Sequence, residues 1–223
     1  MMSGRGRLPT ASAALAGIPA GVQLLGPWSG RRQLFVKFAV EAETATIYSA
    51  AGLRSDLARL AARSRYHSVA ITGNDALAEI DFLLEAFSEP GSLPVMLDHD
   101  GQRPDALDGL LPSLAMLQVT MEGSEGPAAA ERACASLRRA ALQRVAHAVA
   151  IVPTEMVSDG PLLRIVEQIH EASGDAQVVV HPVHERTLAQ DRRWGHWLEQ
   201  AMAVHADIRV LPRPPALMRA PVS

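Results

Sequence analysis

Cysteine is almost absent from this sequence, since Cys134 is the only one among 223 residues. An intramolecular disulfide is therefore excluded, and no iron–sulfur cluster can be held by several cysteine thiolates of this chain. Cys134 lies in an Ala-rich segment with a helical pattern, so we expect a small buried side chain there.

Long apolar runs and an excess of basic residues are also missing. No stretch approaches the roughly 18 apolar residues that a membrane span requires, so we expect a cytoplasmic protein with no membrane partner. The formal net charge is -3, and lysine and arginine are scattered along the chain. Without a basic stripe, no nucleic-acid partner is expected.

Several catalytic motifs are missing as well. The sequence has neither Gly-x-Gly-x-x-Gly nor Gly-x-x-x-x-Gly-Lys-Ser/Thr, and it has no Gly-x-Ser-x-Gly elbow. These absences weigh against dinucleotide redox chemistry, nucleoside-triphosphate hydrolysis and serine-hydrolase chemistry.

The composition is otherwise that of a globular domain, with 48% hydrophobic and 20% charged residues. Residues 1–20 combine two arginines with a short Ala-rich stretch between Pro9 and Pro19, and we expect a disordered tail there. Residues 21–223 contain no repeat and no low-complexity linker, so we expect them to form a single domain.

Strand and helix patterns alternate along that domain. The apolar run 34–39 predicts the first buried strand. Further strands are predicted over residues 67–72, 94–97, 114–120, 146–152, 177–180 and 207–211. Helices are predicted over residues 55–63, 76–87, 104–111, 123–145, 159–174 and 187–203. This alternation is typical of a parallel sheet with right-handed crossovers. It predicts an α/β fold, a partial (β/α)6-type barrel of mostly parallel strands with the helices outside.

Polar side chains follow the ends of these predicted strands. In such a fold the strand ends share one rim, where reactive groups are usually found. Each residue on its own is more commonly a turn former or a cap than a ligand. Imidazole and carboxylate groups together can also hold zinc, iron or manganese. The weak candidates for such a site are His99, His181, His184 and Glu185. Their spacing matches no established ligand pattern, so we predict no metal site.

Several motifs in chain order resemble one known family. Residues 23–31 (Gln-Leu-Leu-Gly-Pro-Trp-Ser-Gly-Arg) stand just before the first predicted strand, and residues 35–39 (Phe-Val-Lys-Phe-Ala) lie within it. Residues 72–77 (Thr-Gly-Asn-Asp-Ala-Leu), 98–101 (Asp-His-Asp-Gly), 180–182 (Val-His-Pro) and 208–215 (Ile-Arg-Val-Leu-Pro-Arg-Pro-Pro) follow. Together they resemble radical S-adenosylmethionine (SAM) enzymes, and within them the 7-carboxy-7-deazaguanine synthase family. The resemblance implies a radical-SAM-like partial barrel.

The chain departs from that family where the chemistry resides. The family carries Cys-x-x-x-Cys-x-x-Cys after its first strand, and these thiolates hold a 4Fe-4S cluster that binds and cleaves SAM. The matching positions here are Glu41, Ala45 and either Tyr48 or Ser49, none of which is a thiolate. We therefore predict no cofactor and no catalytic residue, and interpret the chain as a pseudoenzyme.

Three functions remain open at this stage. The first is a catalytically silent binding or regulatory protein that forms a homodimer or pairs with another protein. An exposed apolar patch would support it, with candidates Trp28, Trp194, Trp197 and Leu198. The second is a small-molecule binding module for SAM, a pterin or a deazapurine. Its pocket would contain Thr72, Gly73, Asn74, Asp75, Asp98, Asp100 and His181. The third is an enzyme with new metal or acid–base chemistry at the strand exits.

Overall fold

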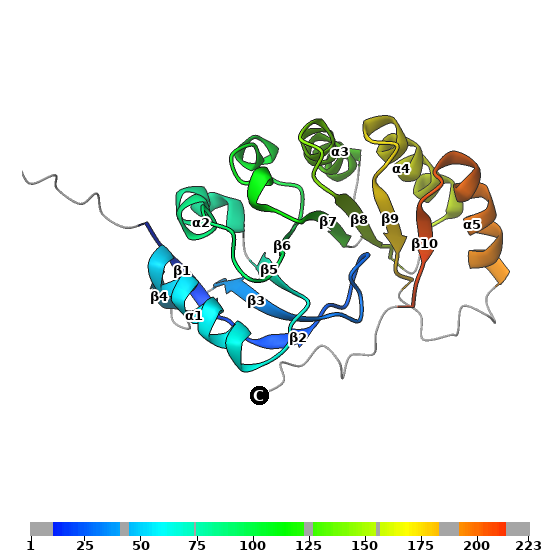
Figure 1. Ribbon diagram of the computed structural model, residues 1–223. Helices are drawn as coiled ribbons and strands as arrows, with labels where there is room; N and C mark the ends of the chain where they lie inside the picture. The colour runs from blue at the N-terminus through cyan, green and yellow to red at the C-terminus, as the bar shows by residue number, and fades with distance from the viewer. Residues whose placement is uncertain are drawn as a thin grey trace, which may run out of the picture.

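A ten-stranded mixed sheet forms the centre of this α/β protein in a computed structural model (Figure 1). The structure describes residues 11–40, 45–73, 75–122, 127–154, 157–182 and 192–212, with Glu122 described by its backbone alone. The strands are β1 (Ser12–Gly17), β2 (Ala20–Val22), β3 (Arg32–Phe38), β4 (Thr46–Ser49), β5 (Ser68–Gly73), β6 (Val95–His99), β7 (Met116–Glu122), β8 (His147–Val152), β9 (Gln177–Val180) and β10 (Ile208–Val210). The α-helices are α1 (Ala50–Arg63), α2 (Ile80–Ala86), α3 (Pro127–Leu142), α4 (Asp159–Ala172) and α5 (Arg192–Val204). Short 3-10 helices are η2 (Ala76–Glu79), η3 (Pro104–Leu107) and η4 (Leu111–Ser113).

The larger part of the sheet is parallel, as the alternating pattern predicts. Its strand order is β10-β9-β8-β7-β6-β5-β3-β1-β4, and the pairs from β3 to β10 are all parallel. Helices α2 to α5 lie along the outer side of the curved sheet (Figure 1). The sheet is open, because β4 and β10 stand at its two ends rather than pairing with each other.

Alternating side chains explain why the sheet has an outer and an inner face. On β3, Leu34, Val36 and Phe38 are buried and belong to the same core cluster as residues of α1 and α2. Phe35 points to the opposite face, where it packs beside Trp28 against small and sulfur-containing side chains of the neighbouring strands. The helices therefore cover one face, and the other face is partly covered by the segment before β3.

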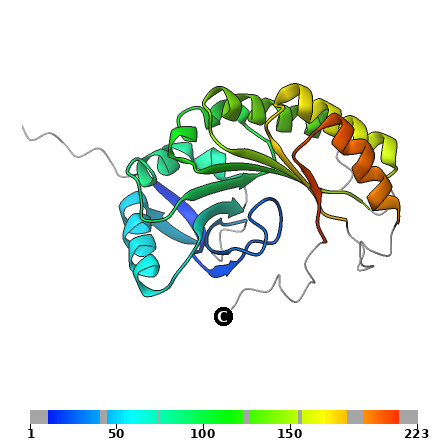
Figure 2. The ribbon, with the colours of Figure 1, turned by 45° about the vertical axis from the view of Figure 1, so that its right-hand side comes forward.

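That segment is a loop that joins β2 to β3 across the inner face (Figure 2). It is closed by backbone hydrogen bonds from Gln23 to Arg31 and from Gly30 to Gln23, each 2.8 Å long. Trp28 packs on the inner-face cluster and is only partly exposed. The loop thus places an aromatic side chain inside the curve of the sheet.

The N-terminal strands correct one prediction. We expected a disordered tail over residues 1–20, and residues 1–10 lie outside the described residues. Within residues 11–20, however, β1 pairs antiparallel with both β3 and β4, and Ala20 begins β2, which pairs with β3. Leu15 of β1 is fully buried. Small alanine side chains make this strand weakly hydrophobic, so its stability comes from the two ladders it joins rather than from a local apolar pattern.

Helix α1 begins earlier than predicted. Residues 55–63 were expected to be helical, but the helix starts at Ala50. Ser49 is the N-cap residue, and its side-chain oxygen accepts a hydrogen bond from the Gly52 backbone N–H at 3.1 Å. An oxygen-bearing cap satisfies one of the free N–H groups of the first turn, which fixes this start.

Two of the proposed interface tryptophans belong to the core. Trp194 and Trp197 are 7% and 1% exposed, and their rings meet edge to face at 5.8 Å. Leu198 is partly buried and packs against the same cluster.

Cys134 is buried, as predicted, and burial raises the pKa of its thiol. Within the described residues, no helix combines the length and the apolar character needed to cross a membrane.

Candidate functional site

The carboxyl ends of β5 and β6 enclose a small cavity. Its volume is about 150 Å³. The residues that line it are Gly73, Asp75, Ala76, Leu77, His99, Asp100 and Gln102. Four of these lie at predicted strand exits, and the parallel pairing of β5 with β6 is what brings them together.

Gly73 allows the cavity wall to approach the neighbouring strand. Its φ is +107°, and a Cβ there would lie 2.6 Å from the carbonyl oxygen of Phe38. Only glycine fits such a close approach with a positive φ. The end of β5 is therefore held tightly against the end of β3.

Asp75 and Arg103 form an ion pair at the rim of this cavity, with 2.6 Å between Nε and Oδ2. Both residues have positive φ, 23° for Asp75 and 52° for Arg103. Such backbone conformations cost free energy in residues other than glycine and gather at functional sites. The ion pair holds the loop after β5 against the loop after β6.

His99 supplies the cavity with a buried hydrogen-bond donor. Burial lowers the pKa of the His99 imidazole to about 4, so the ring is neutral near pH 7. Its Nδ1 accepts a hydrogen bond from the Gly101 backbone N–H at 3.3 Å, which leaves the proton of the neutral ring on Nε2. Nε2 is enclosed and makes no hydrogen bond of normal geometry among the described residues, although the backbone of Gln102 lies close enough to the ring to raise its pKa. A buried donor without a partner is costly, and a bound acceptor would relieve that cost.

Asp100 supplies acceptors beside that donor. Its two carboxylate oxygens accept hydrogen bonds from the backbone N–H and the side-chain amide of Gln102, at 3.0 and 2.7 Å. Asp100 is exposed, and each carboxylate oxygen has more than one lone pair. The cavity therefore offers one N–H donor and carboxylate acceptors. Gln102 was not among the predicted site residues, because it lies beyond the turn that follows β6.

Thr72 and Asp98 lie apart from this cavity, although both were predicted to line it. They precede Gly73 and His99 by one residue, and successive side chains of a strand point to opposite faces. Asp98 Oδ1 accepts a hydrogen bond from the Thr120 hydroxyl at 2.6 Å, and Thr120 Oγ1 accepts one from Gln118 Nε2 at 3.1 Å. This polar chain lies on the inner face of the sheet.

His181 has a structural contact on the same inner face. It is fully buried at the end of β9, and its Nε2 accepts a hydrogen bond from the Gly26 backbone N–H at 2.8 Å. Gly26 has a φ of +77°, and a Cβ there would lie 1.9 Å from Gln118 Oε1. His181 therefore anchors the loop before β3 rather than lining the cavity.

Three of the four positions that match the family's cluster loop are described, and they lie in β4 or directly before it. Ala45 directly precedes β4, Tyr48 lies opposite Ala13 in the β1–β4 ladder, and Ser49 caps α1. Glu41 lies outside the described residues.

The weak metal candidates are not brought together by the described part of the chain. His99 faces the cavity, His181 holds the inner-face loop, and His184 and Glu185 lie outside the described residues, as does Asn74. No group of three or more potential ligands is found among the described histidines, cysteines and carboxylates.

The comparisons with known proteins add no assignment to this geometry. No protein-family model matches the chain, and no curated protein matches it.

Proposed function

We propose that this chain is a radical-SAM-like protein that binds a small ring-bearing ligand and carries out no radical chemistry. The observation that carries the proposal is the cavity at the ends of β5 and β6, which His99 lines with a neutral ring whose Nε2 makes no hydrogen bond of normal geometry among the described residues. Motifs in residues 23–39, 72–77 and 98–101 support the family resemblance.

The size of the cavity restricts the ligand. A volume of about 150 Å³ is comparable to an engineered protein cavity that holds a benzene ring, so one ring fits. A whole SAM molecule exceeds that space. The ligand would place a single ring, or the ring end of a larger molecule, between the two strand exits.

The polar groups restrict its chemistry. The His99 N–H requires an acceptor on the ligand, such as a carbonyl oxygen, while Asp75 and Asp100 accept from ligand N–H groups. A lactam edge with a carbonyl next to N–H donors meets both needs. Pterins and deazapurines carry such an edge, which makes them the best match among the ligands considered.

The residues at the cluster-loop positions support the proposal that no radical chemistry takes place. Glu41, Ala45, Tyr48 and Ser49 offer no thiolate, and Ser49 is committed to capping α1. Cys134 alone cannot replace three cluster ligands, and its thiol is buried in α3.

A thermal-shift panel tests the ligand proposal. A pterin or deazaguanine at about 100 times its dissociation constant should stabilise the fold by ~2.7 kcal/mol, which raises Tm by roughly 5–10 °C. We expect a smaller shift with SAM, because it does not fit the cavity. His99→Leu should abolish the shift with the ring ligands, since it removes the enclosed donor.

The matched control is His196→Leu, because His196 is 83% exposed on α5 and remote from the cavity. This variant should keep the full shift. No shift with any ring ligand, or an equal shift in His99→Leu, would overturn the proposal.

A second candidate function is pairing with a protein, and the exposed edge of the sheet favours it. Strand β4 ends the sheet and pairs only with β1 in the described part of the chain. Ile47 of this strand is 70% exposed. An edge strand with exposed apolar side chains can add a strand from another chain, and a second copy of this protein is the partner we propose.

A further inference from the structure

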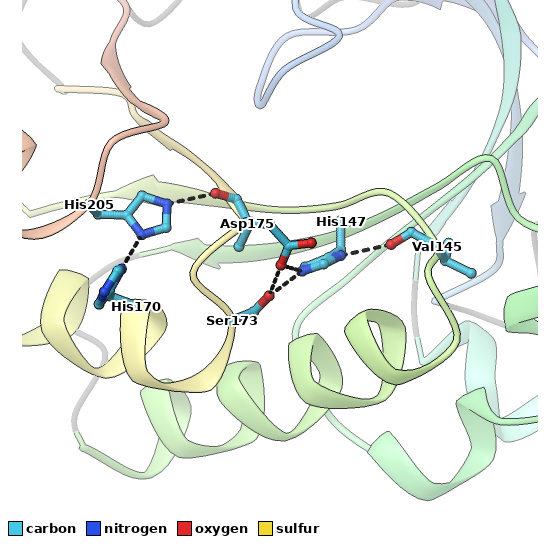
Figure 3. Close-up of polar contacts among 7 residues, drawn as sticks. Val145, His147, His170, Ser173, Asp175 and His205 are labelled. Carbon is cyan, nitrogen blue, oxygen red and sulfur yellow. Dashed lines mark hydrogen bonds and ion pairs between the residues drawn. The ribbon is translucent and has the colours of Figure 1, made fainter.

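The rings of His170 and His205 meet beside the turn that leads into β9 (Figure 3). His170 lies in the last turn of α4, and His205 directly follows α5. The turn between α4 and β9 passes beside them and contributes the Ala176 carbonyl group. The pair therefore lies near the amino-terminal ends of the parallel strands, whereas the cavity lies at the carboxyl-terminal ends.

The orientation of His205 is fixed by its other nitrogen. The Nε2 of His205 lies 2.6 Å from the carbonyl oxygen of Ala176. A carbonyl oxygen only accepts, so Nε2 carries the proton and Nδ1 of the neutral ring presents its lone pair. Histidines that bind metals are held in the same way, with the second ring N–H donated to a carbonyl or carboxylate group.

The Nδ1 atom of His170 lies at a distance from the Nδ1 atom of His205 that suits a shared ion. The two Nδ1 atoms are 3.3 Å apart, and the rings are nearly perpendicular at 83°. Two imidazole nitrogens that bind one tetrahedral ion with bonds of ~2.0–2.1 Å are themselves separated by roughly 3.3 Å. The two nitrogens, which are hydrogen-bonded to each other in the free protein, therefore already have the separation that a shared ion requires.

We propose that His170 and His205 form a two-histidine site for a divalent transition-metal ion. His205 is fully buried and His170 is exposed, so an ion can reach the pair from the solvent on the His170 side. On binding, the Nδ1 proton of His170 moves to Nε2 of the same ring through solvent, and both Nδ1 lone pairs bind the ion.

The chemistry of the pair selects the class of metal. Imidazole suits copper, nickel and zinc, whereas magnesium and calcium require oxygen ligands. Among the described residues no third ligand joins the pair, so water molecules would complete the coordination. The carboxylate of Asp175 lies near enough for electrostatic interaction with His205, which favours a cation there.

Isothermal titration calorimetry of the full chain with CuCl2, NiCl2, ZnCl2 and MgCl2 tests the site. We expect one ion per chain, with affinity highest for Cu2+ and no binding of Mg2+. His170→Ala should weaken Cu2+ and Zn2+ binding at least about tenfold, a loss that even an outer-shell partner produces when removed. His196→Ala, another exposed histidine on a helix, should keep wild-type affinity.

The variant at His170 removes an exposed side chain near a helix end, so the fold should persist, and circular dichroism checks this. Electron paramagnetic resonance of the Cu2+ complex provides a second readout, in which we expect hyperfine splitting from two nitrogen ligands. An absence of binding by the wild type, unchanged affinity in His170→Ala, or a copper spectrum without nitrogen splitting would overturn the proposal.

Discussion

His99 determines what the cavity can bind because its ring stays neutral. Burial lowers the pKa of His99 from 6.5 to about 4, while the carboxylate of Asp100, the backbone of Gln102 and the carboxylate of Asp75 act in the opposite direction. The folded chain therefore keeps a neutral donor ring where the unfolded chain would already be protonated. This difference links the cavity to the stability of the fold.

The pH dependence of stability should reveal that link. Between pH 6.5 and about 4 the unfolded chain binds a proton at His99 that the folded chain does not, so the free energy of unfolding falls as the pH falls. The loss attributable to His99 is at most ~1.4 kcal/mol for each pH unit in this window. Urea unfolding at several pH values measures it.

His99→Leu should remove this part of the slope. The remaining histidines contribute equally to the wild type and the variant, so the difference between the two curves isolates His99. Parallel curves across the whole window would show that the ring is protonated in the folded protein as readily as in the unfolded one.

Side-chain direction was the main limit of prediction at this scale. The strand was predicted to end at residue 97, but β6 extends through His99. Asp98 therefore faces the inner side and bonds to Thr120, while His99 and Asp100 line the cavity. A shift of two residues in a strand end is enough to separate neighbours, because side chains alternate with a period of two.

Strand β4 is the element that the sequence pattern did not reveal. Its four residues follow a polar segment. Each of them pairs with a residue of β1 that lies more than thirty positions earlier in the sequence, as Ser49 does with Ser12. Local propensity carries little information about such pairing, since a short edge strand depends on its neighbour for stability. The helix start at Ser49 was missed for the same reason, because the strand before it decides where the cap lies.

The edge formed by β4 gives a prediction at the scale of elements. If two copies pair through this edge, Ile47→Lys should weaken the dimer at least about tenfold, because a charge on an exposed edge strand disfavours pairing. Sedimentation velocity over a range of protein concentrations measures the change.

Leu142→Lys provides the control, since Leu142 is an 84% exposed apolar residue at the end of α3, away from the edge. This variant should dimerise like the wild type. A wild-type chain that stays monomeric throughout, or equal weakening by both substitutions, would contradict pairing through β4.

Across the whole molecule, the alternation of apolar runs and amphipathic segments predicted the parallel part of the sheet. It predicted each of the parallel strands β3 and β5 to β10 with bounds within two residues, and those of β9 match residues 177–180, because buried parallel strands read as short apolar runs. The N-terminal strands could not be predicted in this way. They complete the sheet through antiparallel pairing, and their burial depends on the finished fold.

The common direction of the parallel strands also separates the cavity from the proposed histidine site. Parallel strands place all their carboxyl ends on one side, where the cavity forms, and all their amino ends on the other, where His170 and His205 meet. Substitutions at one site should leave binding at the other unchanged, since no described residue takes part in both.

Nuclear magnetic resonance of the His99 imidazole tests whether this ring is the donor for a bound ligand. In the free protein near neutral pH, we expect a neutral His99 ring with its proton on Nε2. Addition of a pterin or deazaguanine should move the Nε2–H resonance downfield and slow its exchange with water, because the enclosed donor gains an acceptor. The resonances of His147, a buried ring outside the cavity, should not change. A His99 signal that is unaffected at saturating ligand, or that titrates near pH 6.5 like an exposed histidine, would contradict the account.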